Sequence, residues 1–144
     1  RLPSVRITDV TTPFDDPQAE LGWMFLQSLS EDGDLDEGFG LLADDFTYWS
    51  NAILRTCGKA ELRQIADRIR ALARVEFDLI SCTNEGDNVV IEARPDGVTT
   101  AGVRYDTPIV FVFETRDGLI TALREYDDTR LVEEAFGSVL SRER

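Results

Sequence analysis

The chain has 144 residues, 42% hydrophobic and 30% charged, which suits one domain with a buried core and argues against disorder. Its formal net charge of −13 argues against nucleic acid or an anionic membrane as a partner, because both bind positively charged surfaces. The absence of histidine excludes Ser-His-Asp and Cys-His nucleophiles and the usual zinc sites. Acid–base chemistry is therefore left to Asp, Glu, Tyr, Lys and Arg, and we expect neither a metal nor a cofactor.

The pattern of the first half of the chain predicts helices and one strand. Asp16-Pro17 is a typical helix start, and apolar residues recur at helical spacing from Leu21 to Leu29. A short helix is expected over 35–42 and an aromatic-rich strand over 46–53. Residues 62–73 carry the clearest amphipathic stripe and predict a third helix.

The second half has the alternating pattern of strands. We expect strands at 75–82, 88–94, 98–113 (bent near Pro108) and 119–127, turns at 84–87, 96–97 and 117–118, and a closing helix over 130–140. Helices grouped before a curled antiparallel sheet predict an α+β fold, with the helices on one face of the sheet. The absence of linkers, repeats and low-complexity tracts predicts a single domain over 1–144.

The last strand carries acidic residues where a half-buried strand seldom has them. Asp117-Gly118 between two β-type runs predicts a hairpin, because glycine adopts positive φ without steric cost. The second run then places Glu125 and Asp127 on one face. A carboxylate on the core-facing side of a strand needs partners or a function, so the orientation of Glu125 decides how the strand is interpreted.

The order of elements and the segments 31–49, 58–63 and 118–128 resemble the nuclear transport factor 2-like superfamily, in its SnoaL-like and limonene-epoxide-hydrolase-like branches. The resemblance covers roughly residues 18–137. It implies a cone-shaped, cystatin-like α+β fold in which a curved mixed or antiparallel sheet is wrapped by three N-terminal helices around an apolar pocket. It also implies a homodimer.

The resemblance suggests two kinds of pocket chemistry. Steroid isomerase relatives use an aspartate base with a tyrosine and a protonated aspartic acid. The matching positions here hold Ser50, Leu26 and Val110, so that machinery is absent.

Epoxide hydrolase relatives use an Asp–Arg–Asp set with a tyrosine and an asparagine. Asn51 matches the asparagine, Trp49 stands at the tyrosine and Glu125 at the last-strand aspartate. The Arg-x-Asp pair of that family falls on Glu92-Ala-Arg94, so the acidic residue stands where the family has the arginine and the arginine stands where it has the aspartate. Glu92 and Arg94 share one face of a strand, so they either join Glu125 in a catalytic cluster or form an exposed pair on the outer face.

Aromatic residues exceed what a small core needs, so some of them should line the pocket or an interface. The candidate substrate-binding residues are Trp49, Tyr48, Phe46, Trp23, Ile109, Phe111 and Tyr105. The candidate catalytic residues are Glu125, Arg94, Glu92 and Asn51. Plain core packing is the competing interpretation for each aromatic side chain.

The function predicted from these residues is an enzyme that binds a small hydrophobic molecule bearing a carbonyl or epoxide group. Carboxylate acid–base chemistry would follow an epoxide-hydrolase-like or polyketide-cyclase-like course. The alternatives are a non-catalytic dimeric ligand-binding domain and a fold with a collapsed, empty pocket. Two cysteines, Cys57 and Cys82, fit a reducing cytoplasm, and no apolar run reaches the roughly 18 residues of a membrane span.

Overall fold

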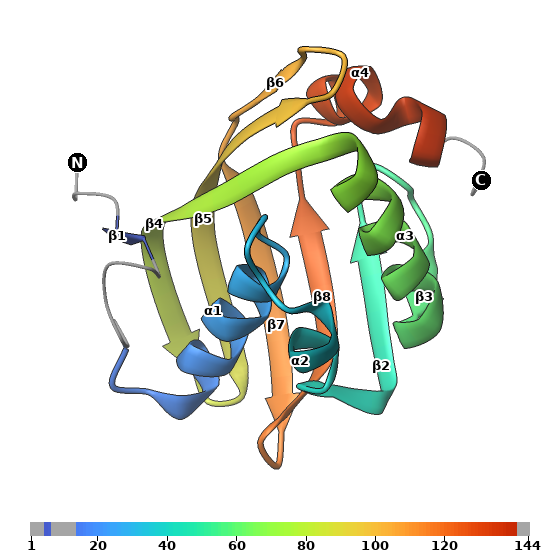
Figure 1. Ribbon diagram of the computed structural model, residues 1–144. Helices are drawn as coiled ribbons and strands as arrows, with labels where there is room; N and C mark the ends of the chain where they lie inside the picture. The colour runs from blue at the N-terminus through green and yellow to red at the C-terminus, as the bar shows by residue number, and fades with distance from the viewer. Residues whose placement is uncertain (1–4, 7–13, 141–144) are drawn as a thin grey trace.

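The computed structural model describes residues 5–6 and 14–140, and it has an α+β architecture in which one curved sheet carries helices on its inner face (Figure 1). The helices are α1 (Pro17–Ser28), α2 (Leu35–Phe39), α3 (Lys59–Leu72) and α4 (Thr129–Leu140). The strands are β1 (Val5–Arg6), β2 (Leu42–Ser50), β3 (Thr56–Gly58), β4 (Ala73–Glu85), β5 (Asn88–Thr99), β6 (Arg104–Tyr105), β7 (Ile109–Arg116) and β8 (Leu119–Tyr126). The predicted fold class is confirmed.

The sheet is mixed. Across the described residues its order is β1-β4-β5-β7-β8-β2-β3, with β6 paired to β5. The β2–β8 pair is parallel and the other pairs are antiparallel. This order puts the first long strand next to the last one, so residues about 75 apart in sequence become neighbours in the sheet.

Local signals account for most element boundaries. The Asp16 carboxylate accepts hydrogen bonds from the backbone N–H groups of Gln18 and Ala19, both at 2.9 Å, and so begins α1 as predicted. Asp117 and Gly118 both have positive φ (53° and 79°), which is the conformation of a type I′ hairpin turn between β7 and β8.

Two predicted features between residues 96 and 113 are wrong. Asp96-Gly97 is not a turn, because Gly97 lies inside β5, where a Cβ atom would come within 3.2 Å of the Tyr105 carbonyl oxygen. The glycine permits a close strand approach there. The expected strand 98–113 is divided instead: β5 continues to Thr99, the chain turns through Gly102 (φ 86°), and β6 folds back onto β5 before β7 begins.

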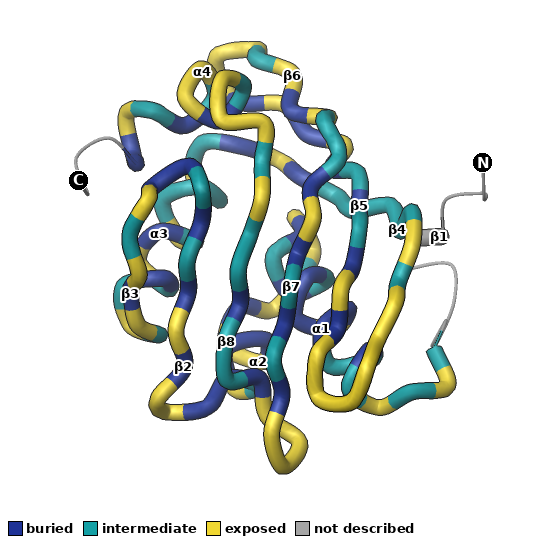
Figure 2. Tube along the Cα trace, turned by 180° about the vertical axis from the view of Figure 1, so that it is seen from behind, coloured by how far each residue is buried: buried dark blue, intermediate teal, exposed yellow. Residues whose placement is uncertain are grey.

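The aromatic strand β2 is also shifted from the expected range 46–53 to Leu42–Ser50, and α2 ends at Phe39 instead of 42. Alternating burial along β5 and β7 separates a buried inner face from an outer face that none of the described helices covers (Figure 2). No helix between residues 14 and 140 is long and apolar enough to cross a membrane.

Candidate active site

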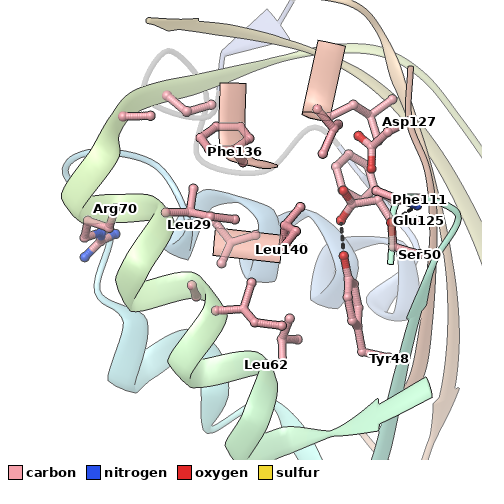
Figure 3. Close-up of a pocket in the computed structure, with 18 of the residues that line it drawn as sticks. Leu29, Tyr48, Ser50, Leu62, Arg70, Phe111, Glu125, Asp127, Phe136 and Leu140 are labelled. Carbon is pink, nitrogen blue, oxygen red and sulfur yellow. Dashed lines mark hydrogen bonds between the residues drawn. The ribbon is translucent and has the colours of Figure 1, made fainter. Parts of the chain in front are cut away.

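A cavity of about 120 Å³ lies between the inner face of the sheet and helices α1, α3 and α4 (Figure 3). A single water needs roughly 10–15 Å³ by the same kind of measure, so the space admits a small organic molecule. Its walls are mainly apolar side chains from the sheet and from the helices: Phe25, Leu29, Leu62, Ile65, Ile69, Phe77, Ile109, Phe111, Leu123, Val132, Phe136 and Leu140. The cavity argues against the alternative of a collapsed pocket.

The end of β8 points two carboxyl groups into this cavity. Ile120 and Leu123 are both buried although they are three residues apart, which a regular strand does not allow. The register explains it: Ile120 pairs with Thr115 and Ala122 with Glu114, so Thr121 is an extra residue in a β-bulge. Beyond the bulge, regular alternation brings Glu125 inward after Leu123, and the next inward position is Asp127.

Two tyrosines hold the carboxyl groups. The Tyr48 hydroxyl, from β2, donates to Oε1 of Glu125 at 3.2 Å, and the Tyr105 hydroxyl, from β6, donates to Oδ1 of Asp127 at 3.1 Å. The carboxyl groups of Glu125 and Asp127 also interact directly, and a hydrogen bond between them requires a proton on one of them. We call Glu125 and Asp127 the carboxyl pair.

The surroundings favour a proton on the carboxyl pair. Burial raises the pKa of Glu125 well above its ordinary value, and the charge of Asp127 raises it further, against a smaller lowering by the Tyr48 hydrogen bond. Burial also raises the pKa of Asp127, opposed by hydrogen bonds from Glu125, Tyr105 and Ser50. Both carboxyl groups border the cavity and are partly accessible, but they are shielded from bulk water.

The tyrosines stay protonated for the same reasons. Burial, together with the neighbouring carboxylates, raises the pKa values of Tyr48 and Tyr105 well above the ordinary tyrosine value. They are therefore hydrogen-bond donors at neutral pH. No arginine or lysine among the described residues forms an ion pair with either member of the carboxyl pair.

Asn51 lies next to the carboxyl pair, but its amide is already bonded. Its Nδ2 donates to the Asp127 carbonyl oxygen at 3.1 Å, while its Oδ1 accepts from the Asp127 backbone N–H at 3.0 Å. Its own N–H donates to the Glu125 carbonyl oxygen at 3.2 Å. The side chain of Asn51 thus extends the hydrogen-bond ladder between β2 and β8 and fixes the position of the carboxyl pair. Asn51 does not line the cavity.

Glu92 and Arg94, expected as possible partners of Glu125, are not in the cavity. Alternation along β5 turns Val89, Ile91 and Ala93 inward, all fully buried, which leaves the even-numbered positions on the outer face. Glu92 accepts a hydrogen bond from the Ser81 hydroxyl and Arg94 donates to the Asp106 carbonyl oxygen, both on the exposed side. The predicted cluster with Glu125 does not form.

The predicted pocket-wall residues divide into two groups. Tyr48, Tyr105, Ile109 and Phe111 line the cavity, whereas Phe46, Trp23 and Trp49 do not. Phe46 and Trp23 are fully buried core residues. Trp49 follows Tyr48 on β2 and so faces outward, where its ring lies 5.4 Å from that of Tyr126 on the neighbouring strand.

Many residues of the cavity are absent from the predicted site, among them the polar residues Asp127, Ser50 and Arg70. Asp127 shares the face of Glu125, and the two-residue spacing was the available signal. Ser50 is buried at the end of β2 and accepts a hydrogen bond from the backbone of Ala52. Arg70 carried no signal in the sequence, because its position depends on how α3 packs against α1.

Comparison with known families identifies the domain. The family model for the SnoaL-like domain matches residues 25–123, more than half of the chain. The chain belongs to the SnoaL-like domain family. This confirms the resemblance seen in the sequence, and the matched range includes Tyr48 and Tyr105 but ends before Glu125.

Solved structures agree on the SnoaL-like fold. A protein with a ketosteroid isomerase-like fold from Catenulispora acidiphila is 24% identical, with a TM-score of 0.69 over 82% of this chain and 92% of its own. A candidate polyketide cyclase from Xanthomonas campestris is 22% identical, with a TM-score of 0.72 over 83% and 96%. An LEH-like epoxide hydrolase from M. tuberculosis is 21% identical, with a TM-score of 0.69 over 88% and 94%. No curated protein matches the sequence.

Proposed function

We propose that this SnoaL-like domain is an acid–base catalyst that moves a proton at the carbon next to a carbonyl group in an apolar small molecule, as in an isomerisation or a cyclisation. The observation that carries the proposal is the carboxyl pair, Glu125 and Asp127, which lies at one end of an apolar cavity with each carboxyl group bound by a tyrosine hydroxyl. A pair of acids that holds one proton near neutral pH supplies a general acid and a general base together.

The surroundings assign the roles within the pair. Glu125, whose carboxyl group is bound only by the Tyr48 hydroxyl among the neighbouring side-chain donors, carries the proton and donates it to the substrate carbonyl oxygen. Asp127 is the base, because three hydrogen bonds favour its ionised form, and it takes the proton from the adjacent carbon. The electron pair of the broken C–H bond forms the enol C=C bond, and the carbonyl π electrons pass to the oxygen protonated by Glu125.

The enol then completes either reaction. In an isomerisation, Asp127 returns its proton to a different carbon of the conjugated system, and Glu125 recovers its proton from the oxygen. In a cyclisation, the enol carbon attacks a second carbonyl of the same molecule and forms the ring bond. The π electrons of that carbonyl pass to its oxygen, which takes the proton held by Asp127, and Glu125 recovers its proton from the enol oxygen as the first carbonyl reforms. Tyr48 and Tyr105 remain bound to the carboxyl pair and stabilise whichever carboxylate is present.

Epoxide hydrolysis fits the site less well. That reaction needs a water held for attack, and the Asn51 amide predicted for this task is bonded at both ends to the Asp127 backbone. Among the described residues, no cation lies between the carboxyl groups to keep both ionised. The neighbours described as a candidate polyketide cyclase and a ketosteroid isomerase-like protein support a carbonyl substrate by analogy of fold alone.

Hydrogen–deuterium exchange tests the proposal without knowledge of the natural substrate. An apolar cyclic ketone such as 2-decalone is incubated with the protein in D₂O, and loss of the proton signals next to the carbonyl is followed by NMR. We expect catalysed exchange in the wild type and a loss of about 10²–10⁴-fold in Glu125→Gln and Asp127→Asn. Glu85→Gln, the same substitution in the exposed β4–β5 hairpin, should exchange like the wild type.

Ketone binding without catalysed exchange would favour the alternative, a non-catalytic ligand-binding domain. Hydrolysis of an apolar epoxide by the wild type, lost in the same two variants, would favour the epoxide-hydrolase-like reaction instead. Each outcome is read on protein whose folding has been checked by circular dichroism, because both variants alter partly buried positions.

A further inference from the structure

The cavity that holds the carboxyl pair has a second polar end at Arg70. This arginine stands in the last turn of α3 and lines the same cavity. Figure 3 shows it on the opposite side from Glu125 and Asp127, with the apolar side chains of Leu29 and Leu140 between them. The space is therefore polar at both ends and apolar in the middle.

Arg70 has hydrogen-bonding capacity that the protein does not use. Its Nη2 donates to the carbonyl oxygens of Ser28 at 2.9 Å and Ser30 at 2.6 Å, and so satisfies the end of α1. Its Nε is buried and has no hydrogen-bond partner. No carboxylate of the described residues forms an ion pair with it. A buried donor without a partner calls for a bound water or ligand.

The charge at this end of the cavity favours an anion. Glu31 also lines it, but its Oε1 accepts a hydrogen bond from Nε of Arg74 at 2.7 Å, so that carboxylate is already paired. Arg70 therefore remains, among the described residues that line this end, the charged group without an oppositely charged partner. At the other end the carboxyl pair disfavours a further negative charge. A ligand with one anionic group would therefore bind in a single orientation.

We propose that the cavity binds an amphipathic anion, an apolar molecule whose carboxylate is held by Arg70 while its opposite end reaches Glu125 and Asp127. A carboxylate accepts hydrogen bonds from several guanidinium N–H groups at once, which makes it the matching group for Arg70. The placement of a carbonyl at the far end rests on the proposed function, whereas the anionic end rests on Arg70 alone.

Calorimetric titration at pH 7 with octanoate and octanamide tests this, because the two probes differ in charge and share the same chain. We expect the wild type to bind octanoate about tenfold more tightly, the equivalent of one charge-assisted hydrogen bond. Arg70→Gln should lose that preference. Arg116→Gln should keep it, since it removes the same charge from an exposed residue that pairs with Asp45 away from the cavity. The net charge of −13 repels anions in general, so nonspecific binding would not imitate the result.

Equal affinity of the wild type for both probes would overturn the proposal, and so would an undiminished octanoate preference in Arg70→Gln. Because Arg70 also bonds to the end of α1, that variant can fail to fold. A second measurement then uses the wild type: the Nε–H signal of Arg70 in ¹⁵N NMR should shift with octanoate and not with octanamide, and an unshifted Arg70 signal refutes the site. Glu125→Gln should retain the octanoate preference while losing deuterium exchange, so the two proposals can fail separately.

Discussion

Replacing Glu125 by glutamine should change how the stability of the protein depends on pH. The substitution keeps the size and shape of the side chain but removes its ionisation. Because the folded-state pKa of Glu125 is raised well above its ordinary value, mainly by burial, the folded protein keeps a proton that the unfolded chain has already released. The wild type must therefore lose stability as the pH rises from the pKa of Glu125 in the unfolded chain to its pKa in the folded protein. The variant has no ionisable proton at position 125 and lacks this loss.

The size of the effect follows from linkage. The free energy of unfolding changes with pH by 2.303RT for each proton of difference, and the folded state binds more protons here, so the slope is negative. Glu125 contributes about −1.4 kcal/mol per pH unit, from the ordinary glutamate pKa of 4.5 up to its raised folded-state value. Below pH 4.5 Glu125 adds no slope, because it is protonated in both states.

Urea denaturation measured at several pH values between about 5 and 8 checks this prediction. The stability of Glu125→Gln should rise relative to the wild type as the pH increases from the lower end of this range, with Glu85→Gln following the wild type. Parallel curves for the wild type and Glu125→Gln would refute the reasoning, because they would mean that Glu125 ionises in the folded protein as it does in the unfolded chain.

Three further substitutions test other parts of the structure. Asn51→Ala removes two hydrogen bonds to the Asp127 backbone, so it should cost about 2 kcal/mol in urea denaturation and slow the deuterium exchange of the ketone. Arg94→Gln should leave exchange unchanged because Arg94 lies on the outer face, and a tenfold loss in a folded variant would contradict its placement. Phe136→Ala should cost about 3–5 kcal/mol in thermal denaturation, since its ring is buried against Tyr105; a loss below about 1 kcal/mol would show that α4 does not pack there.

The local signals in the sequence predicted the elements well. Helix caps such as Asp16 and the Asp117-Gly118 turn act through neighbouring backbone groups, so their effect can be read from a few residues. Gly97 shows where this fails. An Asp-Gly pair is also suited to a place where two strands approach closely, and only the tertiary structure distinguishes that use from a turn.

The candidate site was predictable in part for a similar reason. Alternation within one strand correctly associates Glu125 with Asp127, but the side that faces the core depends on the bulge at Thr121. The face of Glu92 and Arg94 depends on how β5 is placed between β4 and β7. Arg70 reaches the cavity through contacts between helices that are distant in sequence, and short-range patterns carry no information about such contacts.

Direct titration of the carboxyl pair tests the central claim most closely. The ¹³C signals of the Glu125 and Asp127 carboxyl carbons are followed by NMR from acid to alkaline pH and assigned with Glu125→Gln and Asp127→Asn. We predict two coupled steps, with the second well above the ordinary carboxyl range, so that the pair still holds one proton near neutral pH. Two independent steps at ordinary aspartate and glutamate pKa values would contradict the account, because the site would then lack its general acid.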